Sequence, residues 1–286
     1  MSYFVNIILL ILSIAYYTMV ERKILSFMMM REGPNKPLLL GMSTPLGDAI
    51  KLFSKQTLFL KLSVNFYTFF GPAISFILML LLWGILPNWY EESSAWSSLW
   101  FLGISSLSVY GIFISGWGSN SKFSFLGSIR SIAQTISYEI SMGTLLICFI
   151  NHNKMFDLEK FLYSYPLLIS CIPLLTIWFM SSLMETNRAP FDLSEGESEL
   201  VSGFNTEYGS LKFAMLYLSE YGTMLFLSAL TSLMFTGKYF SISMFFFIFC
   251  FVWFRSAFPR IRYDILMSFM WKSSLPLVLS MLLWTL

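Results

Sequence analysis

The chain has 286 residues, of which 56% are hydrophobic and 12% are charged, and its mean hydropathy is +0.69. Soluble domains usually carry about 25% charged residues, so this composition excludes an ordinary soluble domain and predicts an integral membrane protein. The formal net charge is only +2, and no basic cluster alternates with aromatic residues, so no nucleic-acid partner is expected.

Nearly uncharged runs recur along the chain at the length of membrane-spanning helices. About 20 helical residues are needed to cross roughly 30 Å of hydrocarbon. The runs are continuous, whereas the strands of a membrane barrel alternate between apolar and polar residues. The sequence therefore predicts an all-α fold, a polytopic membrane helical bundle of about eight spans in a single domain, 1–286. The predicted spans are 3–20, 66–87, 97–119, 132–151, 163–184, 212–236, 239–254 and 265–286.

The first connection, 21–65, is too long for a plain turn and carries the pattern of a helix on the membrane surface. Thr44 is suited to cap such a helix, with Pro45 at its first position and Asp48 in its first turn. Apolar residues then alternate with lysines over 50–55. This pattern favours an amphipathic inner-side helix that lies along the bilayer.

Lysine and arginine are distributed unequally between the two sides that these spans define. Fifteen of the 18 fall on the side that holds the connections after the first, third, fifth and seventh spans. Only Lys154, Lys160 and Lys238 fall on the other side. Because positively charged connections stay on the inner side of a membrane, the first side is predicted to be the inner one, and both chain termini are predicted to face the outer side.

Two glutamates, Glu139 and Glu220, lie inside predicted spans rather than at their ends. An ionisable group at that depth costs a few kcal/mol or more, and by default it marks a functional pathway that faces the bundle interior. A protonated, hydrogen-bonded glutamic acid that joins two helices is the alternative interpretation.

The predicted inner-side loop 185–212 concentrates carboxylates, and Arg188 is its only basic residue before Lys212. Carboxylates held close together away from water cannot all ionise, so they share protons and titrate as a coupled set. The apolar segments "APF" and "ELVSGF" favour a re-entrant-like loop folded back against protein or bilayer, and an ordinary solvated acidic loop is the alternative. The acids are Glu185, Asp192, Glu195, Glu197, Glu199 and Glu207.

The three cysteines, Cys148, Cys171 and Cys250, each stand alone in an apolar run, and His152 is the only histidine. Haem, zinc and iron–sulfur sites need clusters of such ligands. We therefore expect this chain to bind no iron–sulfur cluster, haem or metal, and we expect any electron carrier, flavin included, to be held by another subunit. A basic group before the last span is interpreted either as topology anchors or as a contact for membrane lipid headgroups or an acidic partner: Arg255, Arg260 and Arg262.

Read in order, several segments of the chain resemble one family. They are "ERK", "REGPN", "GDAIKLFSK", "SIRSIAQTISYE", "ETNRAPFDLSEGESELVSGFNTEY" and "FPRIRYDILMSFMWKSSLP". Over almost its whole length the chain is similar to the membrane subunit 1 family of respiratory complex I, NADH:ubiquinone oxidoreductase, of the mitochondrial type. The resemblance implies a subunit that is not catalytic alone and that serves ubiquinone as substrate. It also implies contacts with quinone-site subunits of the peripheral arm and with neighbouring membrane-arm subunits.

The same resemblance assigns roles by position. In that family the inner-side loop and the first connection build a quinone access chamber, and the acids begin a proton path into the membrane arm. By implication the residues around the chamber are Glu21, Arg22, Arg31, Asp48, Arg188, Phe191, Phe204 and Arg255. Those along the proton path are Glu139, Glu185, Asp192, Glu195, Glu197, Glu199, Glu207 and Glu220. After "KLFSK" the family commonly has Glu, whereas this chain has Gln56, so no proton role is assigned there.

Two alternatives stay open at this point, a related membrane subunit of a hydrogenase-type complex and a self-contained secondary transporter. A transporter often has paired half-repeats with broken helices at the midplane, and the sequence shows no such repeat. The chain holds 30 Phe and 18 Met but nine Ala, a composition typical of an A+T-rich mitochondrial genome. The expected location is therefore the mitochondrial inner membrane, with several passes and both termini on the intermembrane-space side.

Overall fold

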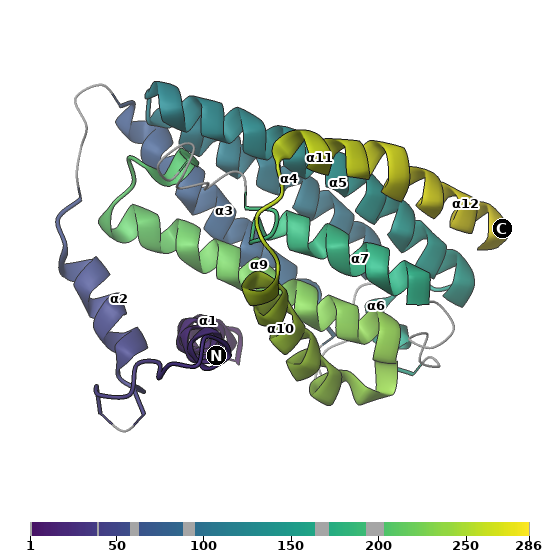
Figure 1. The fold of residues 1–286 in the computed structure, drawn as a ribbon, viewed down its shortest axis with the longest axis horizontal. Coiled ribbons are helices and arrows are strands. Elements are labelled where there is room, and N and C mark those ends of the chain that lie inside the picture. The colour runs from purple at the N-terminus through teal and green to yellow at the C-terminus, as the bar shows by residue number, and fades with distance from the viewer. Residues whose placement is uncertain are drawn as a thin grey trace.

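The computed structural model of the chain describes residues 2–38, 40–57, 63–87, 95–163, 172–192 and 203–285. Within these ranges every regular element is a helix, which confirms the predicted helical bundle. The helices α3, α4, α5, α7, α9 and α12 run roughly parallel, whereas α1 and α2 lie at one edge (Figure 1). The elements are α1 Ser2–Met28, α2 Thr44–Ser54, α3 Asn65–Ile85, α4 Ser97–Gly118, α5 Lys122–Asn153, α6 Leu158–Phe161, α7 Ile172–Glu185, η1 Gly203–Asn205, α9 Ser210–Thr236, η2 Gly237–Tyr239, α10 Phe240–Ala257, α11 Tyr263–Phe269, the π-helical turn η3 Met270–Ser274, and α12 Leu275–Thr285.

Six stretches of the described chain are long and apolar enough to cross a membrane. They correspond to α1, α3, α4, α5, α9 with α10, and α11 with α12. The stretch Ser210–Ala257 is divided at Gly237, which adopts a φ of +50° that glycine tolerates without strain, so it supplies the predicted sixth and seventh spans. The predicted fifth span corresponds to α7, and its earlier residues, 164–171, lie outside the described part of the chain.

The predicted end of the first helix and the predicted start of the surface helix differ from the structure. The first apolar run ends at residue 20, but α1 continues to Met28 because charged side chains do not interrupt backbone hydrogen bonding, so Glu21 and Arg22 are helical. In α2 the capping position is Ser43 rather than Thr44, and the Thr44 hydroxyl instead donates a hydrogen bond to the carbonyl of Gly41 (2.7 Å). The first turn of α2 therefore contains no acidic residue, and Asp48 lies further along the helix.

The helices α3 and α4 pack closely because small residues face one another between them. A side chain on Gly71 would meet the backbone nitrogen of Ser115 at 2.8 Å, and one on Gly118 would meet the backbone nitrogen of Thr68 at 2.9 Å. Within a membrane, helix association depends on such close packing, because lipid tails are as apolar as the helices. These contacts fix one wall of the bundle.

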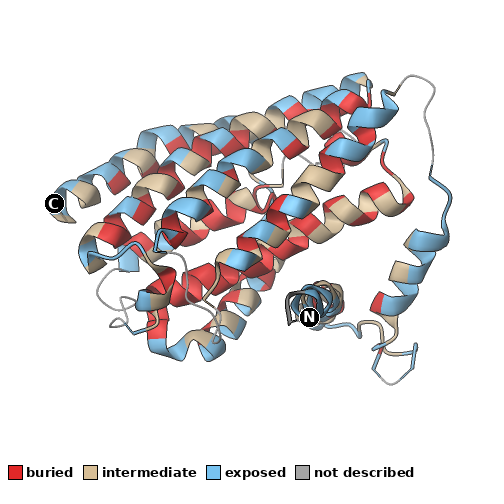
Figure 2. Ribbon diagram, turned by 180° about the vertical axis from the view of Figure 1, so that it is seen from behind, coloured by how far each residue is buried: buried red, intermediate tan, exposed pale blue. Residues whose placement is uncertain are grey.

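The helix α9 is the centre of the bundle. It packs against α3, α10, α1, α2 and α7. It is buried along most of its length, while the outer faces of the surrounding helices are exposed (Figure 2). Its C-terminal half is uncharged and mostly apolar, with the Phe235 ring 4.8 Å from that of Phe149 and the Phe226 ring 5.6 Å from that of Phe101. Its N-terminal half carries the polar residues described below.

Replacing Gly71 by alanine should separate α3 from α4. The added methyl group meets backbone atoms that cannot rotate away, so overpacking should destabilise the protein by roughly 1–3 kcal/mol. The measurement is the midpoint of thermal inactivation and the yield of the detergent-solubilised native assembly.

The matched control is Gly84→Ala on the same helix, where an added methyl group meets nothing within 4 Å. This control should be neutral or slightly stabilising, because alanine favours a helix more than glycine does. Equal stability of the two variants would contradict the packing described here.

Candidate functional site

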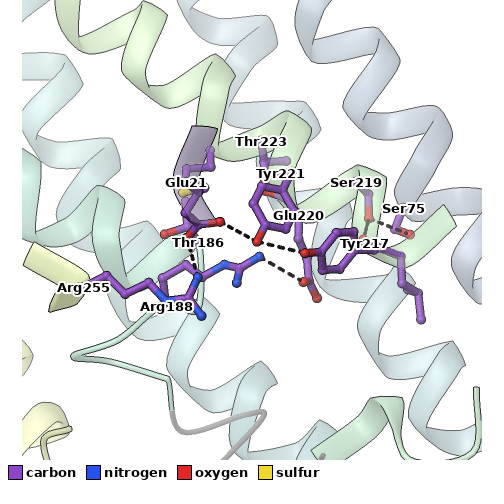
Figure 3. Close-up of polar contacts among 12 residues, drawn as sticks. Glu21, Ser75, Thr186, Arg188, Tyr217, Ser219, Glu220, Tyr221, Thr223 and Arg255 are labelled. Atoms are coloured by element: carbon purple, nitrogen blue, oxygen red, sulfur yellow. Dashed lines mark hydrogen bonds and ion pairs between the residues drawn. The ribbon is translucent and has the colours of Figure 1, made fainter. Parts of the chain in front are cut away.

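A buried carboxylate joins three helices on one side of α9. Glu21 of α1 is only 3% exposed, and it pairs with Arg255 of α10. The hydroxyl of Tyr221, on α9, donates a hydrogen bond to the second oxygen of Glu21 (2.6 Å; Figure 3). A carboxylate taken out of water is tolerated only with such partners. The three side chains therefore hold α1, α9 and α10 in register.

A second ion pair, between Arg188 and Glu220, packs against the ring of the same tyrosine. The guanidinium carbon of Arg188, in the segment that follows α7, is 4.2 Å from the centre of the Tyr221 ring. Its Nη2 atom is 4.0 Å from Oε2 of Glu220, the residue that precedes Tyr221 (Figure 3). The hydroxyl of Tyr217, one turn earlier on α9, donates to the hydroxyl of Tyr221 (3.0 Å). Two arginines and two glutamates thus surround one tyrosine.

A third ion pair lies at the edge of this cluster. Arg22, the residue after Glu21 on α1, pairs with Asp48 of α2 at 3.0 Å. Both side chains are about half exposed, with relative values of 51% and 52%. Arg22 also interacts with the side chain of Tyr217, so this arginine links the surface helix α2 to the cluster.

The segment 186–192 is held by a buried glutamine. Gln134 of α5 donates from Nε2 to the carbonyls of Met184 (3.3 Å) and Phe191 (3.2 Å), which lie on either side of Arg188. The backbone nitrogen of Ile261 donates to the carbonyl of Pro190 (3.0 Å). Since these bonds tie the segment at both ends, they determine where the Arg188 side chain lies.

Two cavities lie beside these carboxylates, and the larger of the two is on the side of Glu220 that faces away from Arg188. Its walls come from α3, α4, α5, α9 and the segment after α7, and Glu220 and Glu185 both line it. About 80 Å³ is open to the centre of a water-sized sphere, and one water needs ~10–15 Å³ on that measure, so several waters fit. The hydroxyl side chains that line it are Ser75, Ser105, Ser108, Thr135, Thr186, Ser219 and Thr223.

These hydroxyls are arranged so that they cost little to bury. Ser75, Ser105 and Ser219 each donate to the carbonyl three residues earlier in their own helices, at 2.9, 3.0 and 2.6 Å. The Ser75 oxygen also accepts from the Ser219 hydroxyl (3.4 Å). Because each hydroxyl has two acceptor sites besides its proton, each keeps at least one lone pair available to accept a hydrogen bond. The cavity wall is therefore rich in acceptors.

A smaller cavity joins Glu185 to Glu139. Both carboxylates line it together with Tyr138 and Thr135, and about 10 Å³ is open to the centre of a water-sized sphere. That volume suits roughly one water. Among the described residues, the buried Oε2 atom of Glu185 has no hydrogen-bond partner. Glu185 thus stands between the two cavities with an acceptor unused.

The structure brings together some of the residues predicted from the sequence and leaves others apart. The cluster holds Glu21, Arg188, Glu220 and Arg255, and the cavities join Glu220, Glu185 and Glu139. Phe191 and Phe204 are both buried, and Phe204 lines the larger cavity. Asp192 pairs with Arg260 at 3.3 Å instead of facing the cavities' lining residues. Arg31 is exposed and is not part of the cluster.

The predicted acids of the loop are only partly described. Glu195, Glu197 and Glu199 lie outside the described residues. Glu207 is exposed, whereas its neighbour Tyr208 is buried and donates from its hydroxyl to the carbonyl of Ser115 (2.7 Å). Burial raises the pKa of Tyr208 far above its usual range, so this hydroxyl remains a donor.

Three residues of this site were not among those predicted. Tyr217 and Tyr221 lie one turn apart on α9 beside Glu220, and their i, i+4 spacing places both hydroxyls on one helix face. That spacing was a usable signal in the sequence. Gln134 gave no such signal, because its two acceptors are backbone carbonyls about 50 residues away along the chain.

No group of three or more His, Cys, Asp or Glu side chains in the described ranges is arranged to hold a metal ion. The polar groups gathered here are carboxylates, guanidinium groups and hydroxyls. Such groups exchange protons and hydrogen bonds. They suit a site that binds a polar organic group and moves protons.

Replacing Gln134 by leucine should loosen the segment 186–192. Two buried carbonyls lose their donor at a cost of roughly 1–3 kcal/mol each, so hydrogen exchange at the amides of this segment should accelerate at least about tenfold. Hydrogen-exchange mass spectrometry on the native assembly measures this. The control Ile136→Leu changes an exposed residue of the same helix and should leave the exchange unchanged. Unchanged exchange in Gln134→Leu would show that the glutamine does not hold the segment.

Comparison with known proteins finds matches along nearly the whole chain. The family model described as NADH dehydrogenase matches residues 1–286. The chain is 44% identical to NADH-ubiquinone oxidoreductase chain 1 of Locusta migratoria, over 99% of this chain and 93% of the relative. It is 43% identical to the proteins of the same name from Aedes aegypti, over 96% of this chain and 91% of the relative, and from Patiria pectinifera, over 98% and 92%.

Proposed function

Because the chain belongs to the NADH dehydrogenase family and is similar to NADH-ubiquinone oxidoreductase chain 1, we propose that it forms a chamber for ubiquinone and the start of a proton path in that enzyme. It acts as a membrane subunit of the complex and is not catalytic alone. The observation that carries the proposal is the position of Glu220, which faces Arg188 on one side and the larger cavity on the other.

The ion-pair cluster suits the polar end of a quinone. Reduction of ubiquinone to ubiquinol adds two electrons and two protons, and its carbonyl oxygens accept hydrogen bonds. Arginine side chains donate such bonds, and the cluster contains Arg188 and Arg255. The electrons come from centres held by other subunits. The apolar tail of the quinone finds matching surfaces in a chain that is 56% hydrophobic.

The cavities suit the transfer of protons away from this cluster. The predicted route runs from Glu220 through the larger cavity to Glu185 and then through the smaller one to Glu139. Carboxylates in a poorly hydrated place exchange protons as a coupled set, and waters and hydroxyls between them carry the protons. Glu195, Glu197, Glu199, Asp192 and Glu207 are proposed to feed this route from the inner side.

The same proposal sets the location and the partners of the chain. The apolar spans and the similarity to chain 1 proteins fit a multi-pass protein of the mitochondrial inner membrane. The charge bias favours the matrix for the inner side, with both termini in the intermembrane space. The partners are other subunits of the complex, those around the quinone site among them. A full-length family match favours this function over a self-contained transporter or a hydrogenase-type subunit.

Replacing Glu139 or Glu185 by glutamine should break the carboxylate route. A neutral amide cannot take up and release the proton, so proton pumping coupled to ubiquinone reduction should fall at least about tenfold, as it does when a proton-transfer group is lost. The measurement is the ratio of protons pumped to NADH oxidised in vesicles that contain the assembled enzyme.

The control is Glu32→Gln, which makes the same chemical change at an exposed carboxylate whose partner is Asn35. It should pump like the wild type. A normal pumping ratio in both Glu139→Gln and Glu185→Gln would remove these residues from the proposed path.

A photoreactive ubiquinone analogue should label this chain within 29–64 or 185–209. Arg188→Ala should reduce that labelling several-fold, because a donor to the quinone is lost, whereas Lys160→Ala on the opposite side of the bundle should not. Mass spectrometry of the labelled peptides gives the positions. Labelling confined to other subunits would exclude the chamber.

A further inference from the structure

Tyr221 touches both ion pairs of the cluster. It is 3% exposed, and its hydroxyl donates to Glu21 while its ring lies under Arg188. The Tyr17 ring packs edge-on against it, with centroids 5.7 Å apart, and the Tyr217 ring lies at 4.5 Å. The ring is thus confined on several sides and fastened at its hydroxyl.

The two ion pairs come from different parts of the chain. Glu21 and Arg255 belong to α1 and α10, whereas Arg188 belongs to the segment after α7 and Glu220 to α9. Tyr221 contacts one member of each pair, Glu21 through its hydroxyl and Arg188 through its ring (Figure 3). A change in one pair therefore reaches the other through a single side chain.

We infer that Tyr221 is a positioning residue that couples the Glu21–Arg255 pair to the Arg188–Glu220 pair. Its hydroxyl anchors the ring to Glu21, and the anchored ring holds Arg188 close to Glu220, which lines the larger cavity. A cation over a desolvated aromatic face is attracted to the ring, and the attraction depends on where the ring lies. This inference rests on the proposed function, and within it the hydroxyl and the ring of Tyr221 have separate effects.

The hydroxyl and the ring have separable effects. Tyr221→Phe keeps the ring and removes the bond to the charged Glu21, so it should act on the chamber side. We expect the KM for ubiquinone to rise about tenfold while the pumping ratio stays near the wild-type value, since a bond to a charged group is worth about that factor. Tyr221→Leu also removes the surface under Arg188. It should raise KM similarly and lower the pumping ratio at least about twofold, because Arg188 no longer holds Glu220.

The matched control is Tyr17→Phe. It removes a hydroxyl from a ring packed on Tyr221, but within the described part of the chain that hydroxyl donates to the Met224 sulfur alone (3.7 Å). KM and pumping ratio should both stay at the wild-type level. All measurements are made on the assembled enzyme in vesicles and are normalised to NADH oxidation by an artificial acceptor that bypasses the quinone, so lower assembly does not affect them.

The outcomes distinguish this inference from the function on which it rests. If Glu185→Gln abolishes pumping but both Tyr221 variants keep the wild-type KM and ratio, the coupling role is wrong and the path stands. If Tyr221→Phe and Tyr221→Leu lower the pumping ratio equally, the ring has no separate role and the inference is overturned. If the Glu139 and Glu185 variants pump normally, the proposed path itself fails.

Discussion

The arrangement depends on the cost of placing a carboxylate away from water. Glu21 is buried inside a largely apolar bundle, so it needs a cation and a hydrogen-bond donor within reach. Arg255 and Tyr221 supply them from two other helices. A buried ion pair adds little net stability because desolvation offsets the attraction. Its physical effect is geometric, because it fixes α1 and α10 against the same turn of α9.

Close packing and polar lining are achieved here with small residues of the same types. Glycine and serine let α3 and α4 approach until their backbones touch, as at Gly71 and Ser115. Serine hydroxyls in this wall bond to their own helix, so they need no partner across the interface and leave acceptor sites for the cavity. Leucine at these positions would separate the helices and give the cavity an apolar wall. Small residues thus allow both the close contact and the polar lining.

Hydropathy and charge predicted more of the fold than of the site. The apolar runs predicted nearly every helix, because the thickness of the bilayer sets a similar length for each span. The cost of burying a charge indicated Glu139 and Glu220 as candidate site residues. The pairing of Glu21 with Arg255 joins residues 234 positions apart, which no local pattern in one sequence encodes. The role of Gln134 could not be predicted for a similar reason. Its partners are backbone carbonyls, and because every residue has one, the sequence does not indicate which of them it will bond to. The chemistry of a side chain can be inferred from the sequence, but the backbone groups to which it will bond cannot.

Glu220 meets two demands that exclude each other. Its side chain lies 4.0 Å from Arg188, and it also lines the larger cavity. The attraction to Arg188 acts only on the charged carboxylate, whereas the proposed path requires the same carboxylate to take up a proton. Coupling between two sites is reciprocal in free energy. In the proposed function, an event in the chamber that moves Arg188 is therefore coupled to proton exchange at Glu220, and a proton taken up at Glu220 weakens its hold on Arg188 by the same amount.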